Sequence, residues 1–589
     1  MSSSKRNISI DIKKLTNFKS KKLLDSISNY FQLQQPQTYQ PVMNKFTDII
    51  NNDKSLTNYI FKSKYRCCQI TGIIDEEDDD DCSNFDENMN NNSINDNSSI
   101  TSSVIEQDIS NCIDILCEIE KNENKTYNQR AFVKISPLID PIRILMDTYQ
   151  IPSRETNWYL PNIYNMKTVN KVNSYNNSVY IETLFQYFAS KLTENGLCPT
   201  YPYFYGGVNG IKDEYFHDIS DEYSELKNKK WFNEAKGDIF ELILINNEND
   251  DFDFVSDNDI DCNDDINCDE NIECDEDDSK LNVKYDDNEI DEISKKLKML
   301  DIDDELETFQ LDSDTDGNID TDDDNNDSDN DSDKLEVLSI SSSSEIDIDD
   351  IDNSKLQYIK MDNFPVQLNI LEYLPITLDQ LLDSDYNMSN TEWLSIFFQI
   401  SFGLAVAQKH FKFCHNDLHS SNIMFKPTKA KYLYYYINNN YYKIPTFGKI
   451  TKIIDFARAT FKYNNHWYFS DVFARDGEAE EQYSYPYKNS KNVENSEYPP
   501  NPSFDLVRFA TTITERLDKN EKIKRLVNSW MITDFGNNIG DDEDDFELYI
   551  NIARYCHNAV PIKVLKHKYF KQFLMKNNIK PNKEYIYYY

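Results

Sequence analysis

The amino-acid sequence predicts an α+β protein with two lobes, and the order of its elements is the main reason. Strand patterns dominate the first part of the chain, and helical patterns dominate from residue 391 onward, with chemically active residue types near the junction. Strands followed by helices are typical of folds that segregate the sheet from the helices. We predict a polar and basic tail or docking segment over 1–45, a small strand-rich lobe over 46–374 and a larger helical lobe over 375–589.

The first part of the chain contains strand patterns and one amphipathic helix. CIDILCEIEK (112–121) and QRAFVKI (129–135) are joined by NENKTYN, which has hairpin chemistry. YIFKSKYRCCQITGII (59–74) and VQLNILEYL (366–374) also predict strands. VYIETLFQYFASKLTE (179–194) repeats its apolar residues at helical spacing and therefore predicts a helix.

The second part of the chain is mainly helical in pattern. TEWLSIFFQISFGLAVAQKHF (391–411) and SFDLVRFATTITERL (503–517) predict buried helices, and VLKHKYFKQF (564–573) predicts a helical end. GKITKIIDFARA (448–459) predicts a strand that runs into a loop.

Charge is concentrated in two polar stretches. The formal net charge is −43, and the acidic residues gather in 75–87 and above all in 249–353. Such segments repel themselves and have too few apolar side chains to offset the entropy of ordering. We predict disordered insertions over about 75–103 and 249–353. Strong acidity argues against binding to nucleic acid or to an anionic membrane, because phosphate contacts need Lys and Arg.

The remaining composition predicts a soluble protein of a reducing compartment such as the cytoplasm. No apolar run approaches the roughly 20 residues that span a bilayer, and the eleven scattered cysteines do not predict a disulfide framework. Cys262, Cys268 and Cys274 lack the paired spacing of a zinc site. DSDTDGNIDTDD (312–323) has the spacing of a calcium-binding loop, but such matches arise by chance in an Asp-saturated region.

The stretch FKFCHNDLHSSNIMF (411–425) is the strongest functional signal. It places His415, Asp417, His419 and Asn422 between two apolar runs. Three interpretations are open: a strand–loop–strand that holds catalytic groups, a metal cluster, or an ordinary polar turn. The metal cluster is the weakest of the three, because a His415/His419 pair has no further ligands of suitable spacing nearby.

HNDLHSSN resembles the catalytic loop of the protein kinase family, H-R-D-L-x-x-x-N. The matching positions are His415, Asp417, Leu418 and Asn422. The resemblance implies that Asp417 accepts or orients the proton of the attacking hydroxyl. KIIDFA then supplies Asp455 where the family has Asp-Phe-Gly after a strand. By the same resemblance, Asn422 and Asp455 would hold the magnesium ions that bridge the phosphates of ATP.

A literal Asp-Phe-Gly also exists at 534–536, but we prefer Asp455 as the metal ligand. Asp534 lies beyond the helix predicted at 503–517 and follows a helical pattern. A short strand and loop from 448 brings Asp455 to Asn422 easily, although Ala457 stands where the family has glycine.

The first part of the chain carries further matches to the kinase family. AFVKI resembles the strand V-A-I-K, which makes Lys134 the candidate for the α- and β-phosphates. Its partner would be Glu182, with Glu194 as the alternative. LEYL resembles the hinge whose backbone faces the adenine, at Glu372, Tyr373 and Leu374. In the second part, Asp505 matches the buried Asp that bonds the catalytic-loop backbone.

Several positions depart from the family. The glycine-rich phosphate loop is absent, because Gly72 is the only glycine before Lys134. Asn416 replaces the Arg that binds a phosphate on the activation segment in many kinases, so we expect activity without phosphorylation in 458–500. His419, a candidate catalytic residue, replaces the usual Lys and resembles haspin-type and aminoglycoside-phosphotransferase-type kinases.

The resemblance, which covers the chain in pieces from about residue 65 onward, implies a serine/threonine protein kinase that uses ATP and Mg²⁺. A pseudokinase that acts as an interaction scaffold and a small-molecule phosphotransferase are the alternatives. The partner would be a protein substrate, and the acidic insertion would attract basic segments. The Asn-, Ile-, Asp- and Tyr-rich composition also resembles proteins of giant DNA viruses, which would place the protein in the host cytoplasm or the virion.

Overall fold

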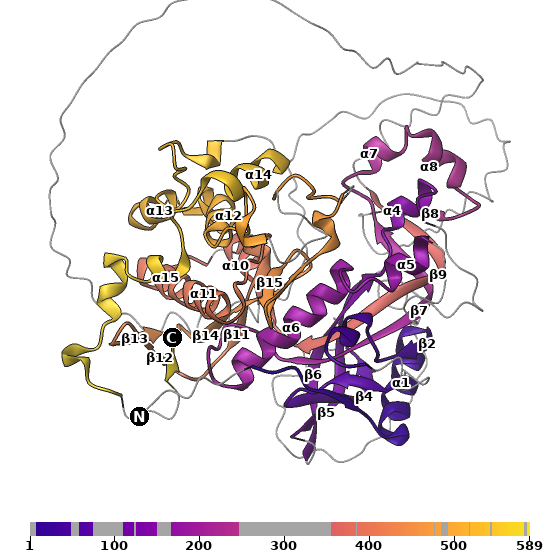
Figure 1. Ribbon diagram of the computed structural model, residues 1–589, viewed down its shortest axis with the longest axis horizontal. Coiled ribbons are helices and arrows are strands. Elements are labelled where there is room, and N and C mark those ends of the chain that lie inside the picture. Colours follow the sequence, from indigo (N-terminus) through magenta and orange to yellow (C-terminus); the bar gives the residue numbers. More distant parts are fainter. Residues whose placement is uncertain are drawn as a thin grey trace, which may run out of the picture. The chain divides into compact units, whose positions relative to one another are not determined.

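A curled antiparallel sheet and a set of helices make up the mixed α+β structure of the described residues in this computed structural model (Figure 1). The described residues are 8–48, 58–74, 110–122, 125–149, 167–246, 355–384, 386–475, 477–483, 493–517, 519–541, 545–581 and 586–589. Those up to 246 and from 356 onward belong to one compact unit. The α+β class is therefore confirmed.

The main sheet has seven strands, in the order β2-β7-β9-β6-β5-β4 with β8 paired to β9. Their bounds are Leu33–Gln37 (β2), Tyr65–Ile73 (β4), Cys112–Lys121 (β5), Lys125–Pro137 (β6), Phe204–Asp218 (β7), Glu241–Asn246 (β8) and Lys355–Glu372 (β9). The predicted hairpin is confirmed as the antiparallel pair β5–β6. The strand predicted over 59–74 is two strands, β3 (Tyr59–Phe61) and β4.

Strand β6 lies inside the sheet and presents Lys134. The Cα atom of Lys134 pairs with Cys112 on β5 and with Asn369 on β9. Because side chains alternate along a strand, Val133 and Ile135 enter the core while Lys134 points to the other face.

Helix α6 (Ser178–Glu194) confirms the helix predicted over 179–194. It packs on the sheet, where the Thr183 hydroxyl donates to Asn369 Oδ1 of β9 at 2.9 Å (Figure 1). The side chain of Asn177 caps the helix by accepting from the backbone N–H of Val179 at 3.1 Å.

The predicted N-terminal tail over 1–45 is wrong for residues 8–45, which are folded. They contain β1 (Ile12–Lys14), α1 (Asn17–Phe31), β2 and the 3-10 helix η1 (Pro41–Lys45). Helix α1 buries the apolar residues Leu23, Leu24, Ile27 and Phe31. The Lys and Ser residues between them make the average composition of the segment polar, so the apolar face of the helix is not apparent from the composition. An ion pair from Lys19 to Glu120 of β5 also ties α1 to the sheet.

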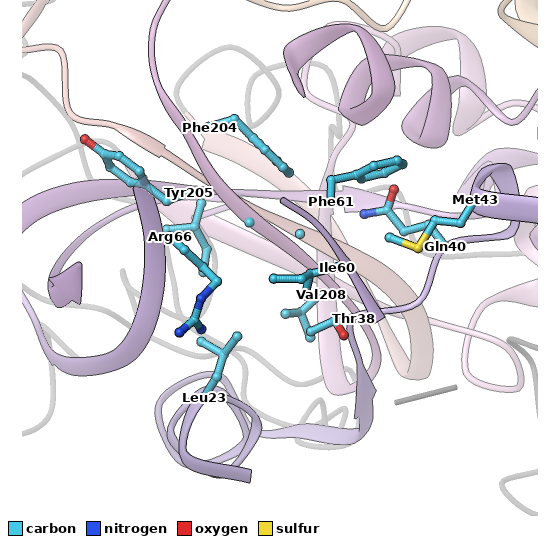
Figure 2. A pocket seen from close by; sticks show the side chains of 13 residues that line it. Leu23, Thr38, Gln40, Met43, Ile60, Phe61, Arg66, Phe204, Tyr205 and Val208 are labelled. Carbon is cyan, nitrogen blue, oxygen red and sulfur yellow. The ribbon is translucent and has the colours of Figure 1, made fainter. Parts of the chain in front are cut away.

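A small cavity of about 20 Å³ lies between this N-terminal segment and the sheet (Figure 2). The side chains around it include Leu23 of α1, Gln40, Arg66 of β4 and Val208 of β7. This volume has room for about one water molecule, so the cavity is not a nucleotide site.

The described residues from 375 onward contain six α-helices, which is no more than the described residues before them contain. They are α10 (Leu378–Asp383), α11 (Asn390–Phe411), α12 (Phe504–Ile513), α13 (Glu521–Asn528), α14 (Asp545–Tyr555) and α15 (Pro561–Val564). Helix α11 confirms the prediction over 391–411. The prediction over 503–517 holds for α12, after which residues 515–517 form a 3-10 turn. The helical end predicted over 564–573 is a 3-10 helix, η9 (Lys568–Phe573), that follows α15.

This part also contains strands that sequence reasoning missed. They are β10 (Ile376–Thr377), β12 (Tyr432–Ile437), β13 (Asn440–Pro445), β15 (Thr460–Tyr463), β16 (His466–Phe469) and β17 (Tyr587–Tyr588). Two further strands were expected: β14 (Lys449–Ile453), and β11 (Ile423–Pro427) as the second strand of the strand–loop–strand interpretation. Asn438–Asn439 and Asn464–Asn465 turn the two hairpins with positive φ at both residues. Paired Asn residues suit such turns, so the signal was present in the sequence.

Both predicted insertions, the cysteines of 262–274 and the calcium-like loop of 312–323 lie outside the described residues. The described strands that flank the acidic insertion, β8 and β9, pair with each other. Among the described residues, no helix combines the length and the apolar character that a membrane crossing requires.

Candidate active site

Lys134 lies between two carboxylates that come from distant parts of the chain. Its Nζ is 2.8 Å from Glu182 Oε1 on α6 and 3.1 Å from Asp455 Oδ2 in the loop after β14. Burial alone would lower the pKa of Lys134, but Asp455 and Glu182 outweigh it and raise the pKa. The ammonium group therefore stays charged and fixed in position. Glu194, the alternative partner, instead pairs with Lys191 at 2.7 Å.

Helix α6 is held in place at its start, and this fixes Glu182. Asp471 accepts from the backbone N–H of Ser178 at 3.1 Å and pairs with Lys171. A carboxylate at this end of the helix also interacts favourably with the helix dipole. Phe185, one turn after Glu182, stacks on Phe413 with ring centroids 4.0 Å apart.

Asp455 has a backbone φ of 61°, in the left-handed region, which turns the chain sharply after β14. Its Oδ1 accepts from the backbone N–H of Ala457 at 3.3 Å. Burial raises the pKa of Asp455, but Lys134 more than offsets this and the pKa is lowered, so the group is a carboxylate. The ring of Phe456 packs against two other rings, with its centroid 5.0 Å from that of Phe185 on α6 and 5.4 Å from that of His415.

The carboxylate of Asp505 on α12 fixes the backbone of the loop that precedes β11. Asp505 accepts from the backbone N–H of His415 at 2.9 Å and of Asn416 at 3.0 Å, and from the Cys414 thiol at 3.3 Å. Burial raises the pKa of Asp505, while its hydrogen bonds oppose this. His415 Nε2 lies 2.8 Å from the carbonyl oxygen of Ile454, which joins the loop to the residue before Asp455.

Asn416, which stands in the place of the family's Arg, is completely buried and tied to the segment after Asp455. Its Nδ2 donates to the carbonyl oxygen of Arg458 at 2.8 Å and to the Thr460 hydroxyl at 3.2 Å. Its Oδ1 accepts from the Tyr483 hydroxyl. Neutral hydrogen bonds therefore organise this segment, without a charged residue at 416.

Asp417, His419 and Asn422 meet on one side of the loop. Asn422 Nδ2 lies 2.9 Å from the carbonyl oxygen of Asp417 and 3.0 Å from His419 Nε2. Burial lowers the pKa of His419, which favours the neutral ring and makes Nε2 the acceptor of this bond. The Asp417 carboxylate accepts from the hydroxyl of Tyr549 on α14. Asp455 is close by, because the backbone N–H of Ile454 donates to the Asn422 carbonyl oxygen at 3.1 Å.

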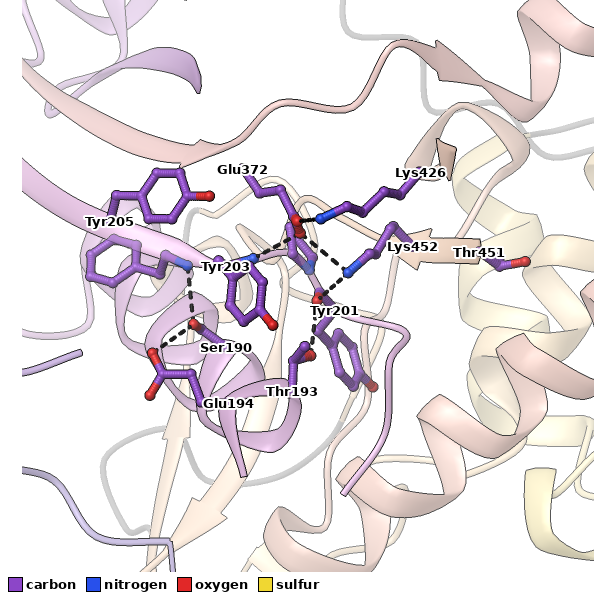
Figure 3. A network of polar contacts seen from close by, with 12 residues as sticks. Ser190, Thr193, Glu194, Tyr201, Tyr203, Tyr205, Glu372, Lys426, Thr451 and Lys452 are labelled. Carbon is purple, nitrogen blue, oxygen red and sulfur yellow. Dashed lines mark hydrogen bonds and ion pairs between the residues drawn. The ribbon is translucent and has the colours of Figure 1, made fainter. Parts of the chain in front are cut away.

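The predicted hinge begins at Glu372, the last residue of β9, and continues at Tyr373 and Leu374. The side chain of Glu372 points inward and is bonded by Lys426 and Lys452 (Figure 3). Its backbone N–H donates to the carbonyl oxygen of Tyr203 at 2.9 Å. The ring of Tyr373 lies 3.9 Å from the guanidinium carbon of Arg130, and Leu374 is buried.

Asp534 of the literal Asp-Phe-Gly pairs with His557 at 2.6 Å, and the neighbouring Phe535 is 74% exposed. The backbone N–H of Asp534 also donates to the carbonyl oxygen of Tyr555, the last residue of α14, at 2.8 Å. The contacts of Asp534 are therefore with the end of α14 and the following loop, unlike those of Asp455 with Lys134.

Asn422 and Asp455 supply amide and carboxylate oxygens, the donor types that Mg²⁺ prefers. Among the described residues no group of three or more His, Cys, Asp and Glu side chains could hold a metal ion by itself. Mg²⁺ in nucleotide sites usually takes only one or two protein ligands and completes its shell with phosphate oxygens and water. The two residues therefore fit a magnesium ion that arrives with a nucleotide.

No family model matches the chain, but parts of it are similar to serine/threonine-protein kinases. It is 34% identical to mouse serine/threonine-protein kinase haspin over 137 residues, or 22% of this chain and 18% of haspin. It is 30% identical to the bovine haspin over 120 residues, or 20% of this chain and 15% of that protein. A probable serine/threonine-protein kinase of Dictyostelium discoideum is 37% identical over 70 residues, or 11% of this chain and 6% of the relative.

The chain thus spans less than a fifth of the length of these curated relatives. The similarities indicate a protein-kinase-like relationship for part of the chain.

Proposed function

We propose that this chain is an ATP-dependent phosphotransferase that transfers the γ-phosphate to a serine or threonine hydroxyl of a protein. The observation that carries the proposal is Lys134, held by Glu182 at 2.8 Å and by Asp455 at 3.1 Å. A fixed ammonium group beside a carboxylate suits the binding of a nucleotide phosphate with its metal ion.

Each residue then has a distinct part in the reaction. Lys134 would bind the α- and β-phosphates, and Glu182 would keep its ammonium group in place. Asn422 and Asp455 would hold Mg²⁺, which neutralises the charge on the transferred phosphoryl group when it is bound. Asp417 would accept the proton of the attacking hydroxyl, and His419 would position Asn422 through the 3.0 Å contact between them.

The proposal extends to the architecture of a kinase. The strand-rich part up to 374 would form the small lobe, and the part from 375 would form the large lobe. ATP would bind between them, with its adenine at the backbone of 372–374. A cytoplasmic location, in a host cell or a virion if the protein is viral, and basic protein segments as partners are part of the same proposal.

A pseudokinase is the second candidate, and one observation favours it. Gly72 is the only glycine before Lys134, so the sequence lacks a glycine-rich loop to cover the phosphates. The connection between β4 and β5, where such a loop would lie, falls mostly outside the described residues. A small-molecule phosphotransferase is the third candidate, because His419 takes the place of the usual Lys.

Transfer of labelled γ-phosphate from ATP, with Mg²⁺, to a panel of proteins and small molecules separates the three candidates. A protein kinase labels protein hydroxyls, a small-molecule kinase labels only the small acceptors, and a pseudokinase labels nothing. Asp417→Asn and Asp455→Asn should each lower transfer by about 10²-fold or more. Asp534→Asn is the matched control and should leave transfer near the wild-type rate. Full activity in Asp417→Asn would refute the assignment.

A further inference from the structure

The hydroxyl of Tyr549 donates a hydrogen bond to Oδ1 of Asp417, the proposed proton acceptor. Tyr549 belongs to α14 and lies 132 residues after Asp417 in the chain. No pattern in the catalytic-loop sequence points to this contact. A proton acceptor needs a defined orientation, since its carboxylate must face the attacking hydroxyl at hydrogen-bond distance.

The ring of Tyr549 is held by charged and aromatic neighbours. The guanidinium carbon of Arg508 on α12 is 4.9 Å from the ring centroid, and that of Arg458 in the loop after Asp455 is 5.4 Å from it. The ring of Phe504, at the start of α12, lies 5.9 Å away. Cation–π contacts of this kind restrain an aromatic ring in a partly buried site. These ring contacts therefore fix the position of the Tyr549 hydroxyl that donates to Asp417.

The local electrostatics keep Tyr549 a donor. Burial raises the pKa of Tyr549, and the Asp417 carboxylate raises it further, while Arg508 opposes both. The phenol thus stays protonated at neutral pH. A single hydrogen bond on Oδ1 leaves the second carboxylate oxygen of Asp417 able to accept the proton of a substrate hydroxyl.

We propose that Tyr549 is a positioning residue that orients the Asp417 carboxylate toward the acceptor hydroxyl. The inference rests on the proposed function, since it concerns the same phosphate transfer. In this role Tyr549 acts through Asp417 and needs no contact with ATP or the acceptor.

The test compares Tyr549→Phe with Tyr555→Phe in the full-length chain. The first variant removes one hydroxyl and keeps the ring between Arg458 and Arg508. The second removes a hydroxyl from the same helix, where the ring of Tyr555 packs on Phe535 at 5.4 Å. Both are assayed for kcat and KM on an acceptor that the wild type phosphorylates, and thermal melting checks that both are folded.

We expect Tyr549→Phe to lower kcat by about tenfold to a hundredfold, because a misplaced catalytic group costs about that much. The KM values for ATP and acceptor should stay the same, and Tyr555→Phe should match the wild type. In an Asp417→Asn background, Tyr549→Phe should have little further effect, since the two residues act as a unit.

Three results would overturn the inference while the proposed function stands. The first is an unchanged kcat in Tyr549→Phe. The second is a higher kcat or a lower acceptor KM in Tyr549→Phe, which would mean that the Tyr549 hydroxyl obstructs the acceptor site. The third is phosphate found on Tyr549 by mass spectrometry. A wild type that phosphorylates no acceptor would instead refute the proposed function, and the inference would fall with it.

Discussion

Nζ of Lys452 lies 3.2 Å from Oε2 of Glu372, and the two side chains are only 3% and 2% exposed. Lys452 also donates to the carbonyl oxygen of Tyr201 at 2.9 Å, and Glu372 accepts from the backbone N–H of Tyr203 at 3.2 Å (Figure 3). Lys426 pairs with the other carboxylate oxygen. The network joins the end of β9 to β14, so it connects the proposed hinge to the strand that leads to Asp455.

Glu372→Gln should destabilise the protein strongly, by about 3–5 kcal/mol, because it leaves Lys452 buried without its counter-charge. Lys426 has a side chain that is 39% exposed, so Lys426→Met should cost only about 0–1 kcal/mol. Urea unfolding of both variants measures the two values. Equal and small losses would mean that the buried pair contributes little. Adding Lys452→Met to Glu372→Gln should recover part of the loss, since it removes the unpaired charge.

The stability that Glu372 supplies should depend on pH. Burial raises the pKa of Glu372, but Lys452 and Lys426 outweigh it, so the folded pKa lies below the ordinary value of 4.5. A carboxyl group whose pKa is depressed on folding stabilises the protein above its unfolded pKa, and this stabilisation is lost as the pH falls through the folded pKa. The difference in unfolding free energy between wild type and Glu372→Gln should therefore shrink from about pH 6 to about pH 3. A constant difference over that range would contradict the ion-pair assignment.

Glu182→Gln should lower kcat/KM by about tenfold to a hundredfold, because Lys134 loses the carboxylate that fixes its ammonium group. Glu194→Gln is the matched control on the same helix, since Glu194 pairs with Lys191 instead. Steady-state kinetics with varied ATP measures both. A larger loss in Glu194→Gln than in Glu182→Gln, with both variants folded, would show that the wrong partner of Lys134 has been chosen.

Gly210→Ala should destabilise the protein by about 1–3 kcal/mol through overpacking. A Cβ atom at Gly210 would lie 2.2 Å from Leu33 Cγ, where β2 pairs with β7. Gly72→Ala is the control, because the nearest atom to its Cβ would be Leu116 Cβ at 3.9 Å. Chemical denaturation of both variants tests whether β2 is docked. If Gly210→Ala lowers the unfolding free energy no more than Gly72→Ala does, the N-terminal segment does not pack on the sheet as described.

Sequence reasoning reached those elements and residues that a local pattern marks. The β5–β6 hairpin, α6 and α11 follow from periodicity and turn residues, which act within a few positions. The loop around Asp417 and Asn422 is likewise a short segment with a recognisable spacing. The structure brings Lys134, Glu182 and Asp455 together, as the order of motifs along the chain led us to expect.

Local sequence patterns did not predict α1 or two of the hairpins, because a second pattern in the same segment obscured the first. Helix α1 carries an apolar stripe, but its Lys, Ser and Asn residues made 1–45 resemble a tail. The hairpins turned at Asn438–Asn439 and Asn464–Asn465 lie in a region whose neighbours are helical, and the paired Asn residues were not weighed against that trend.

The sequence by itself determined the β5–β6 hairpin, the helices α6 and α11, the charge distribution and the short motif around Asp417, because each depends on neighbours along the chain. Only the tertiary structure decided that Tyr549 bonds Asp417, that Asp471 holds the start of α6 and that Lys452 neutralises Glu372. These partners are 80 to 293 residues apart. Burial makes such contacts strong, because a charge or polar group removed from water must find a partner. Which partner it finds is set by how the strands and helices pack, and no local sequence pattern encodes that choice.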